Sequence, residues 1–330
     1  MNKVAFWLNN ARKVALPQSV MPAILAVCLA VGKEGFSILS AVAAVVGVAC
    51  AHLCVNLLDD YFDYKNAGIE SRQQLQRAGM RARIAKATYL ADGSATLAQT
   101  FRAASVFGVI ALAMGCICWL IQDWHVMMIA AIGGLLGYSY SGKPLMLCYR
   151  GLGEIVTGLI FGPLLMLGVY YAACGALRSE VWLMSVAVGL LVINILYTHS
   201  IMDRDADISV GKTTLAVMLP SPKAQLAAEW CFTFLPFVII ICGVVLQAFS
   251  PWMLLTLLTL PMACSLFKMM RCFFSEPKRR FEPKPWMGAM PNWKTIVEAD
   301  LDWFMIRWYL SRNYLTLFMI VAAVVALCTH

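Results

Sequence analysis

Two clusters of aspartate stand out in an otherwise very hydrophobic chain. The first is N-L-L-D-D-Y-F-D at residues 56–63, and the second is D-R-D-A-D at residues 203–207. Each cluster comes directly after a long apolar run. Carboxylates at the edge of a membrane are costly to desolvate, so grouped carboxylates need a counter-charge, which a metal ion or a cationic partner can supply. The chemistry of this protein is therefore expected between the two clusters.

Helical spacing would turn each cluster into a set of ligands. Successive helical residues turn by about 100°, so a helix that continues through residue 63 places four side chains on one face: Asn56, Asp59, Asp60 and Asp63. Asp203 and Asp207, four residues apart, also share a face. Carboxylate and amide oxygens suit Mg²⁺, with phosphate oxygens completing its coordination. The alternative is that these acidic residues merely end helices at the water, and two clusters at matching spacing disfavour it. The predicted metal ligands are Asn56, Asp59, Asp63, Asp203 and Asp207.

Basic residues near the clusters are candidates for neutralising phosphate charge. Lys212 is the strongest, because it follows Asp207 closely and Gly211 permits a turn that aims the lysine back at the cluster. We therefore place Lys212 with the four aspartates Asp59, Asp63, Asp203 and Asp207 as the predicted catalytic set. Four further basic residues are typical both of phosphate ligands and of positive-inside anchors: Arg12, Lys143, Arg150 and Arg204.

Three other side chains are candidates for substrate binding, each with a structural alternative. Tyr140 offers a π face to an allylic cation, or it is an interfacial aromatic residue. Glu154 is a third acidic contributor, or it is a carboxylate favoured by a helix N-terminus. His199 precedes Asp203 by one helical turn, so it is a proton acceptor or a hydrogen-bonded structural histidine. The predicted substrate-binding set is Asn56, Asp60, Tyr140, Lys143, Arg150, Glu154 and His199.

The composition places these residues in a membrane protein. The 330 residues are 61% hydrophobic and 13% charged, with a mean hydropathy of +0.74, whereas soluble domains average about 25% charged residues. Long apolar stretches that are continuous rather than alternating predict membrane-spanning helices and exclude a membrane barrel. We expect one all-α domain over residues 1–330, a bundle of about nine helices around a central cavity. The predicted spans are 15–32, 37–58, 98–121, 125–141, 152–174, 181–201, 224–249, 252–270 and 303–328.

The distribution of positive charge predicts how this bundle is oriented. With the N-terminus in the cytoplasm, all of the 26 Lys and Arg residues except Lys33 and Arg178 fall on the cytoplasmic side. The N-terminus and both aspartate clusters are then cytoplasmic, and the C-terminus is outside, in an integral protein of a bacterial inner membrane. Two cytoplasmic loops are long, a basic one at 59–97 and one at 271–302 that is either a solvated tether or a functional insertion.

Several stretches, in order along nearly the whole chain, resemble the UbiA-type intramembrane aromatic prenyltransferases. Besides the two aspartate motifs, the likeness rests on L-P-Q-S-V-M-P at 16–22, Y-R-G-L-G-E at 149–154, F-G-P at 161–163, G-V-Y-Y at 168–171, G-K-T-T-L-A-V at 211–217 and S-R-N at 311–313. The stretches at 149–154 and 168–171 point to the branch that prenylates 1,4-dihydroxy-2-naphthoate in menaquinone biosynthesis. The chain departs from the family where His199 and Ser200 stand in place of a common Asn, and where Asp60 adds a carboxylate.

The resemblance implies a function for the site. It implies that the two motifs bind Mg²⁺, that the metal holds a polyprenyl diphosphate, and that the cavity opens laterally to lipid. We expect transfer of the polyprenyl group to an aromatic acceptor, most plausibly 1,4-dihydroxy-2-naphthoate, which gives demethylmenaquinone. Two alternatives stay open: another acceptor such as 4-hydroxybenzoate, and a cation-coupled transporter, which would more naturally carry acids at mid-membrane. No nucleic-acid partner is expected, and the sequence leaves the oligomeric state open.

Overall fold

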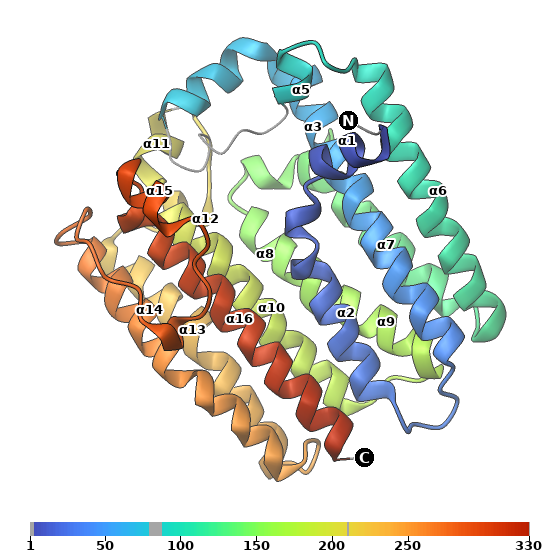
Figure 1. Cartoon of the computed structure of the whole chain (residues 1–330). Helices are drawn as coiled ribbons and strands as arrows, with labels where there is room; N and C mark the ends of the chain where they lie inside the picture. Colours follow the sequence, from blue (N-terminus) through green and yellow to red (C-terminus); the bar gives the residue numbers. More distant parts are fainter. Residues whose placement is uncertain (1–2, 79–87, 210, 330) are drawn as a thin grey trace.

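The computed structural model describes residues 3–78, 88–209 and 211–329, with side chains described outside 66–78. The described chain is helical apart from short connections, and the helices run side by side in an elongated bundle (Figure 1). The two chain ends lie at opposite ends of this bundle. An odd number of crossings, as the sequence predicts, is what places them there.

Nine helical segments in the described chain run along the bundle. They are α2 (Pro17–Ala30), α3 (Ile38–Ala78), α6 (Leu97–Ile121), α7 (His125–Ser141), α8 (Gly153–Leu159) with η3 (Ile160–Leu164) and α9 (Leu165–Cys174), α10 (Ser179–Met202), α13 (Pro222–Val245), η4 (Pro251–Thr259) with α14 (Leu260–Phe273), and α16 (Asp302–Cys328). Seven are long and apolar enough to cross a membrane, while α2 and α7 have 14 and 17 residues. The predicted all-α membrane bundle is confirmed.

Local sequence signals explain where several of these helices begin and end. Pro17 stands at the first position of α2, where its missing N–H costs nothing. Thr96 and Gln99 form a reciprocal capping box at the start of α6. Gly175 ends α9 with a left-handed φ of 70°, a conformation that glycine adopts without strain.

Helix α10 forms the centre of the bundle. It packs against α13, α8, η3 and α16, and 72% of its most apolar stretch is buried inside the protein. Its closest approach is to η3, where a Cβ added to Gly162 would lie 2.5 Å from Gly189 Cα. Small residues of this kind let helix backbones come together inside a membrane. The tight contact fixes the height of α10, which carries Asp203 at its end.

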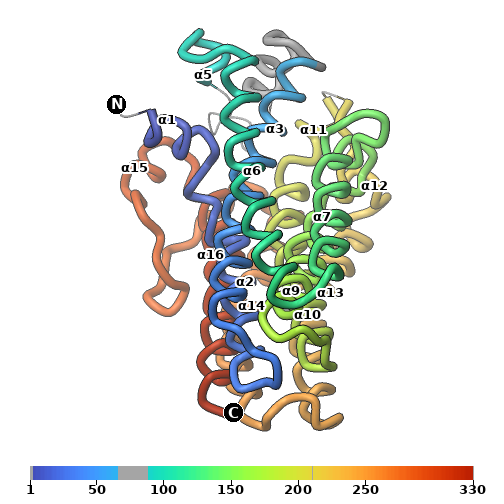
Figure 2. The backbone as a smooth tube through the Cα atoms, turned by 90° about the vertical axis from the view of Figure 1, so that its right-hand side faces the viewer, coloured from blue at the N-terminus to red at the C-terminus, as the bar shows by residue number. Residues whose placement is uncertain are grey.

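The two aspartate clusters lie at the same end of the bundle as the N-terminus. The end of α3, the short helices α1 (Lys3–Asn10) and α11 (Arg204–Ser209), and α5 (Thr88–Ala91) gather there in both views (Figure 1 and Figure 2). Helix α11 contacts α3, so the segments that carry the two clusters touch. The predicted proximity of the clusters therefore has a structural basis.

The two long loops differ from their predicted form. The loop expected from residue 59 begins as helix, because α3 continues to Ala78, and its basic residues at 72–86 lie outside the described side chains. The 271–302 loop packs along α16 instead of running free through solvent. Met287 is buried, and the Asn313 amide of α16 donates to the carbonyl oxygens of Met287 and Ala289 at 2.9 and 3.0 Å.

The loop also contains two short elements, η5 (Pro285–Met287) and α15 (Trp293–Glu298). Both contact α16, and Tyr309 of that helix donates its phenol O–H to the Pro291 carbonyl at 3.1 Å. Since several points of the loop are hydrogen-bonded to one helix face, the description as a solvated tether is wrong.

Candidate functional site

Arg12 supplies the counter-charge of the first aspartate cluster. Its Nη2 lies 3.3 Å from Asp59 Oδ2 and 2.9 Å from Asp60 Oδ1. Asp60 is only 1% exposed, and its second oxygen accepts from the Tyr89 hydroxyl at 3.4 Å. Asp59 also accepts from the Ser141 hydroxyl at 2.6 Å. The first cluster thus finds one cation in the N-terminal segment and a neutral hydrogen-bond donor at the end of α7.

The backbone around Arg12 is shaped to make this contact. Arg12 has a left-handed φ of 60°, between α1 and the short η1 (Lys13–Ala15), and its Nη2 also donates to the Asn56 carbonyl at 2.8 Å. The Asn56 amide donates in return to the Ala11 carbonyl at 3.0 Å. Burial disfavours the charge on Arg12, but attraction to Asp60 and Asp59 outweighs it and raises the arginine pKa. Arg12 is therefore a permanent cation at this position.

Asp63 has a different partner, on the loop between α7 and α8. The Tyr149 hydroxyl, in η2 (Leu147–Tyr149), donates to Asp63 Oδ1 at 2.8 Å. Burial raises the pKa of Tyr149 above its usual value of 10.0, and the Asp63 carboxylate raises it further. The phenol is therefore a neutral hydrogen-bond donor to Asp63 at physiological pH.

The second cluster spans the break between α10 and α11. Asp203 caps α10, and its carbonyl accepts the Asp207 N–H at 2.8 Å, which continues the helical spacing across the break. Gly211 has a φ of 70°, and Lys212 Nζ lies 3.3 Å from Asp207 Oδ1, which is the turn back to the cluster that the sequence predicts. Asp207 Oδ2 is buried and has no hydrogen-bond partner among the described residues. A buried anionic oxygen in this state calls for a cation.

Glu154 ties the second cluster to the bundle. It is 4% exposed, its Oε1 accepts from the Ser200 hydroxyl at 2.5 Å, and its Oε2 accepts from the Leu215 N–H at 3.3 Å. Just before it, the Gly151 N–H donates to the Thr213 carbonyl at 3.1 Å. The segment between these contacts carries Asp203, Asp207 and Lys212. Glu154 stands in the first turn of α8, as the helix N-terminus alternative requires, and its described contacts hold the 200–215 segment in place.

The other predicted substrate residues are spread around these contacts. Tyr140 lines a cavity of about 20 Å³ together with Glu154 and Lys212, room for about one water molecule. Lys143 and Arg150 are exposed, and the Arg150 guanidinium donates to the Pro144 carbonyl at 3.2 Å. The structure thus brings Tyr140 to the second cluster and leaves the two cations at the surface.

His199 lies among aromatic rings of α16. It is 7% exposed and is stacked on Phe304 with ring centroids 5.8 Å apart, and its ring meets Trp308 edge-on at 5.4 Å. Its carbonyl accepts the Asp203 N–H at 2.9 Å. His199 and Asp203 are therefore adjacent along α10, as predicted, with the histidine ring forming an aromatic wall beside the cluster.

The chemistry of the two clusters suits a divalent cation, although the side chains are not gathered around one point. Within residues 3–65, 88–209 and 211–329, no three His, Cys, Asp or Glu side chains are close enough to hold a metal ion. The reason is that Asp59, Asp63 and Asp207 each contact a donor of their own chain. Their hard oxygens and the unpartnered Asp207 Oδ2 nevertheless fit Mg²⁺. The five predicted metal ligands stay a prediction.

A family model described as the UbiA prenyltransferase family matches residues 19–284. The chain belongs to this family. It is therefore a membrane prenyltransferase, and the transferase class expected from the two aspartate motifs is confirmed. The match begins at α2 and ends within the 271–302 loop, so it includes both motifs and the loop that carries Tyr149.

Two UbiA-family relatives are similar over most of their length. The 1,4-dihydroxy-2-naphthoate octaprenyltransferase of Bacillus subtilis is 24% identical over 253 residues, which cover 76% of this chain and 77% of that protein. The 2-carboxy-1,4-naphthoquinone phytyltransferase of Synechocystis is 26% identical over 282 residues, covering 83% and 85%. Both names contain a naphthalene ring system that carries a carboxyl group.

A solved UbiA homologue shares the fold. The structure from Archaeoglobus fulgidus bound to DMAPP and Mg²⁺ has a TM-score of 0.57 and 14% identity, and the superposition covers 96% of this chain and 99% of that chain. At this identity the likeness concerns the arrangement of the helices. It agrees with the nine segments that run along the bundle here.

Sequence reasoning gave no role to three residues that contact the aspartates. Ser141 and Tyr149 bind Asp59 and Asp63, and Tyr89 binds Asp60. Ser141 ends α7 and Tyr149 lies in the loop that follows it, so their position at the same end of the bundle was a usable signal. Tyr89 lies in the short helix α5, 29 residues after Asp60, and no spacing rule joins two positions so far apart.

Proposed function

We propose that this UbiA-family protein transfers a polyprenyl group from polyprenyl diphosphate to 1,4-dihydroxy-2-naphthoate, giving demethylmenaquinol, the hydroquinone form of demethylmenaquinone. The observation that carries the donor half is the unpartnered, buried Asp207 Oδ2 beside Lys212, on a helix that contacts α3. A homologue of the same fold has been solved with DMAPP and Mg²⁺. DMAPP is a prenyl diphosphate, which supports the donor class.

The residues of the two clusters would hold the diphosphate. Asn56, Asp59 and Asp63 on α3, Asp203 at the end of α10 and Asp207 on α11 would hold Mg²⁺. When bound, Mg²⁺ supplies positive charge that stabilises the departing diphosphate. Lys212 is 3.3 Å from Asp207, so its ammonium is placed to reach a phosphate oxygen near that carboxylate. Preorganised charge of this kind lowers the barrier to breaking the allylic C–O bond.

The acceptor half of the reaction follows from charge and shape. As the C–O bond breaks, the allylic carbon becomes cationic, and an electron-rich ring carbon of the acceptor forms the new C–C bond. With a dihydroxynaphthoate, the electron pair of the ring–carboxylate bond returns to the ring and CO₂ leaves. His199 and the rings of Phe304 and Trp308 form an aromatic surface next to Asp203, where a flat acceptor would find π faces. Both relatives named above act on carboxylated naphthalene rings by their names.

The surroundings would protect the cation from water. The isoprenoid tail would lie along apolar helices, and Tyr140, beside Glu154 and Lys212, would present a π face to the allylic cation. For membrane orientation, we place the cluster-bearing end in the cytoplasm, in line with the excess of Lys and Arg at that end.

The test is a reaction panel with a matched control. Membranes that contain the protein are incubated with farnesyl diphosphate, Mg²⁺ and either 1,4-dihydroxy-2-naphthoate or 4-hydroxybenzoate. Prenylated product, released diphosphate and CO₂ are measured. We expect product and stoichiometric CO₂ with the naphthoate alone. Product with 4-hydroxybenzoate alone would refute the naphthoate proposal and leave prenyl transfer standing. Absence of diphosphate release with any acceptor would favour a transporter.

Asp207→Asn and Asp205→Asn make the site assignment testable within one short helix. Asp207 is 10% exposed at its side chain and contacts Lys212, whereas the Asp205 side chain is 99% exposed. Both substitutions remove one negative charge from α11. Asp207→Asn should abolish turnover, and Asp205→Asn should leave it near the wild-type rate.

A further inference from the structure

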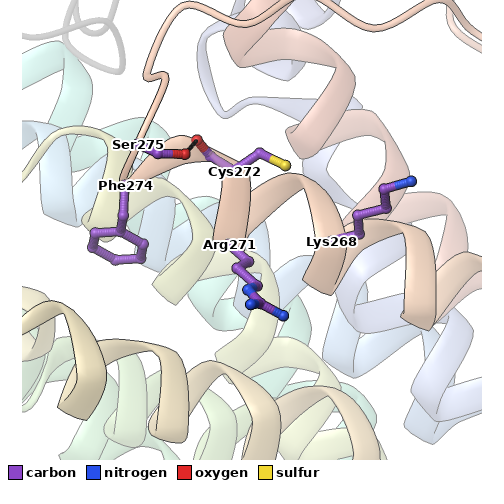
Figure 3. Close-up of a pocket in the computed structure, with 5 residues that line it drawn as sticks. All are labelled: Lys268, Arg271, Cys272, Phe274 and Ser275. Atoms are coloured by element: carbon purple, nitrogen blue, oxygen red, sulfur yellow. Dashed lines mark hydrogen bonds between the residues drawn. The ribbon is translucent and has the colours of Figure 1, made fainter.

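A site with two basic side chains lies on the outer side of α14, and none of the clustered aspartates lines it. A cavity of about 480 Å³ is lined by five residues from the last turns of α14 and the turn that follows: Lys268, Arg271, Cys272, Phe274 and Ser275. Figure 3 shows the Lys268 and Arg271 side chains leaving α14 on adjacent turns, with Phe274 and Ser275 at the helix end. The cavity therefore has two cationic groups and one aromatic wall.

The two cations have no acidic partner within the described part of the chain. Both side chains are exposed, and neither Lys268 nor Arg271 forms a hydrogen bond or ion pair there. The nearest acid in sequence, Glu276, is already bound to Arg279 at 3.4 Å. Two cations three residues apart on a helix lie close together and repel each other unless an anion sits between them. The cavity is thus complementary to a negative group.

The depth of the cavity indicates where this anion comes from. Helix α14 ends the membrane span Pro251–Phe273, so Arg271 stands about half a turn and Lys268 about one and a half turns inside that end. Below them on the same face, at spacings of four and eight residues from Lys268, lie the exposed apolar side chains of Cys264 and Leu260. Cationic side chains near a helix end reach the headgroup level, while an apolar stripe below them faces acyl chains.

We propose that this cavity binds the headgroup of an anionic phospholipid. The lipid phosphate would lie between Lys268 and Arg271, since the guanidinium fork of arginine matches phosphate oxygens and lysine adds a point charge. The acyl chains would follow the stripe through Cys264 and Leu260. Basic pockets at the cytoplasmic end of membrane helices bind anionic lipid headgroups by this chemistry. The site is independent of the proposed acceptor and lies outside the aspartate clusters.

The test measures lipid binding to the purified protein in detergent. The protein is titrated with dioleoylphosphatidylglycerol or dioleoylphosphatidylcholine, and the lipid-bound fraction is read by native mass spectrometry. Phosphatidylglycerol should bind more tightly than phosphatidylcholine. The double variant Lys268→Gln/Arg271→Gln should bind phosphatidylglycerol about 30-fold more weakly, as expected for the loss of two cations at a lipid surface. Its binding of phosphatidylcholine should not change.

A matched control separates a site from a general effect of positive charge. Lys278→Gln/Lys284→Gln removes the same charge from exposed positions in the loop after α14 that do not line the cavity. It should keep phosphatidylglycerol affinity within about twofold, since only cavity cations touch the headgroup. Equal losses in the two double variants would overturn the proposal, and so would equal binding of the two lipids by the wild-type protein.

A third arm distinguishes a lipid from a soluble anion. Inorganic phosphate and diphosphate are added to the phosphatidylglycerol complex at millimolar concentration. The lipid should remain bound, because the acyl chains contribute apolar contacts that a free phosphate lacks. Displacement of the lipid by millimolar inorganic phosphate or diphosphate would show a site for a soluble anion. That result would overturn the lipid proposal. Thermal unfolding of both variants confirms that exposed substitutions leave the fold intact.

Discussion

Replacing Glu154 by Gln is expected to weaken metal-dependent diphosphate binding without touching either aspartate cluster. Glu154 accepts from the Ser200 hydroxyl at 2.5 Å and from the Leu215 N–H at 3.3 Å. These two contacts bracket the segment that carries Asp203, Asp207 and Lys212. Glutamine has nearly the same volume but no charge. Its NH₂ group can donate to the Ser200 hydroxyl oxygen, which also donates to the Leu196 carbonyl, so both contacts can persist but neither is any longer made to a charged acceptor.

The size of the effect follows from the negative charge that disappears. A hydrogen bond to a charged group contributes about 1.5–3 kcal/mol and one between neutral groups about 0.5–1.5 kcal/mol, and Glu154 is 4% exposed, so water does not make up the difference. This difference puts the loss near 1.5 kcal/mol. If this energy no longer holds the segment in its binding position, the apparent affinity for Mg²⁺ and diphosphate falls about tenfold. Glu154→Ala removes both contacts and should reduce the free energy that holds the segment in its binding position by about 3–5 kcal/mol.

The assay is prenyl transfer at saturating acceptor, with Mg²⁺ varied at fixed polyprenyl diphosphate. Glu154→Gln should raise the Mg²⁺ concentration at half-maximal rate about tenfold and lower the rate at saturating Mg²⁺ much less. Glu180→Gln is the control, since Glu180 binds the Tyr170 hydroxyl at 3.0 Å and Lys33 at 3.2 Å at the opposite end of α10. The same Mg²⁺ dependence in wild type and Glu154→Gln would refute the positioning role. Equal shifts in both variants would refute it as well, because they would report a general loss of stability.

Three further outcomes follow from the contacts of the two clusters. Asp207→Ala should abolish turnover in a protein that still inserts into the membrane, and near-normal activity would refute the diphosphate site. Arg12→Gln should lower the thermal midpoint, because it strands the buried first cluster without its cation at a cost of about 3 kcal/mol; an unchanged midpoint would show that the ion pair contributes little. Burial, and then the Asp63 carboxylate, raises the pKa of Tyr149 above 10.0. The folded phenol therefore keeps its proton at a pH where the unfolded phenol loses it, so its contribution to stability is present below about pH 10 and is lost as the pH rises further. Tyr149→Phe should flatten the fall of the thermal midpoint above pH 10, and parallel curves for the two proteins would contradict this reading.

Most of the fold could be predicted from the sequence because a membrane restricts the possible structures. Backbone groups in lipid must be satisfied within each segment, so apolar stretches of sufficient length become helices. The predicted spans 125–141 and 303–328 agree with α7 and α16 to within one residue. The errors fall where the chain leaves the apolar layer. Helix α3 continues beyond residue 58 because its polar turns are held by partners from other segments, which hydropathy does not reveal.

The site was predictable in its acids and less so in their partners. Helical spacing is local, so the sequence alone places Asp59 and Asp63 on neighbouring turns and aims Lys212 at Asp207. The contacts of Arg12 and Tyr149 join positions 48 and 86 residues from their partners in sequence. They depend on how η1 and the loop after α7 fold over the end of the bundle. A single sequence carries no spacing rule for such contacts.

The partners of the acids explain how a membrane protein can fold around so many carboxylates before any ligand binds. Buried charge without a partner costs several kcal/mol per ion, even after relaxation. Here Arg12 pairs with Asp59 and Asp60, Tyr149 hydrogen-bonds Asp63, and Lys212 pairs with one oxygen of Asp207. These three partners come from loops or a terminal segment, whereas Ser141, which also binds Asp59, ends α7. Exchange of the three partners for a metal-bound diphosphate would therefore involve side chains outside the membrane helices. The unpartnered oxygen of Asp207 is then the place where an incoming cation meets the least competition from the chain itself.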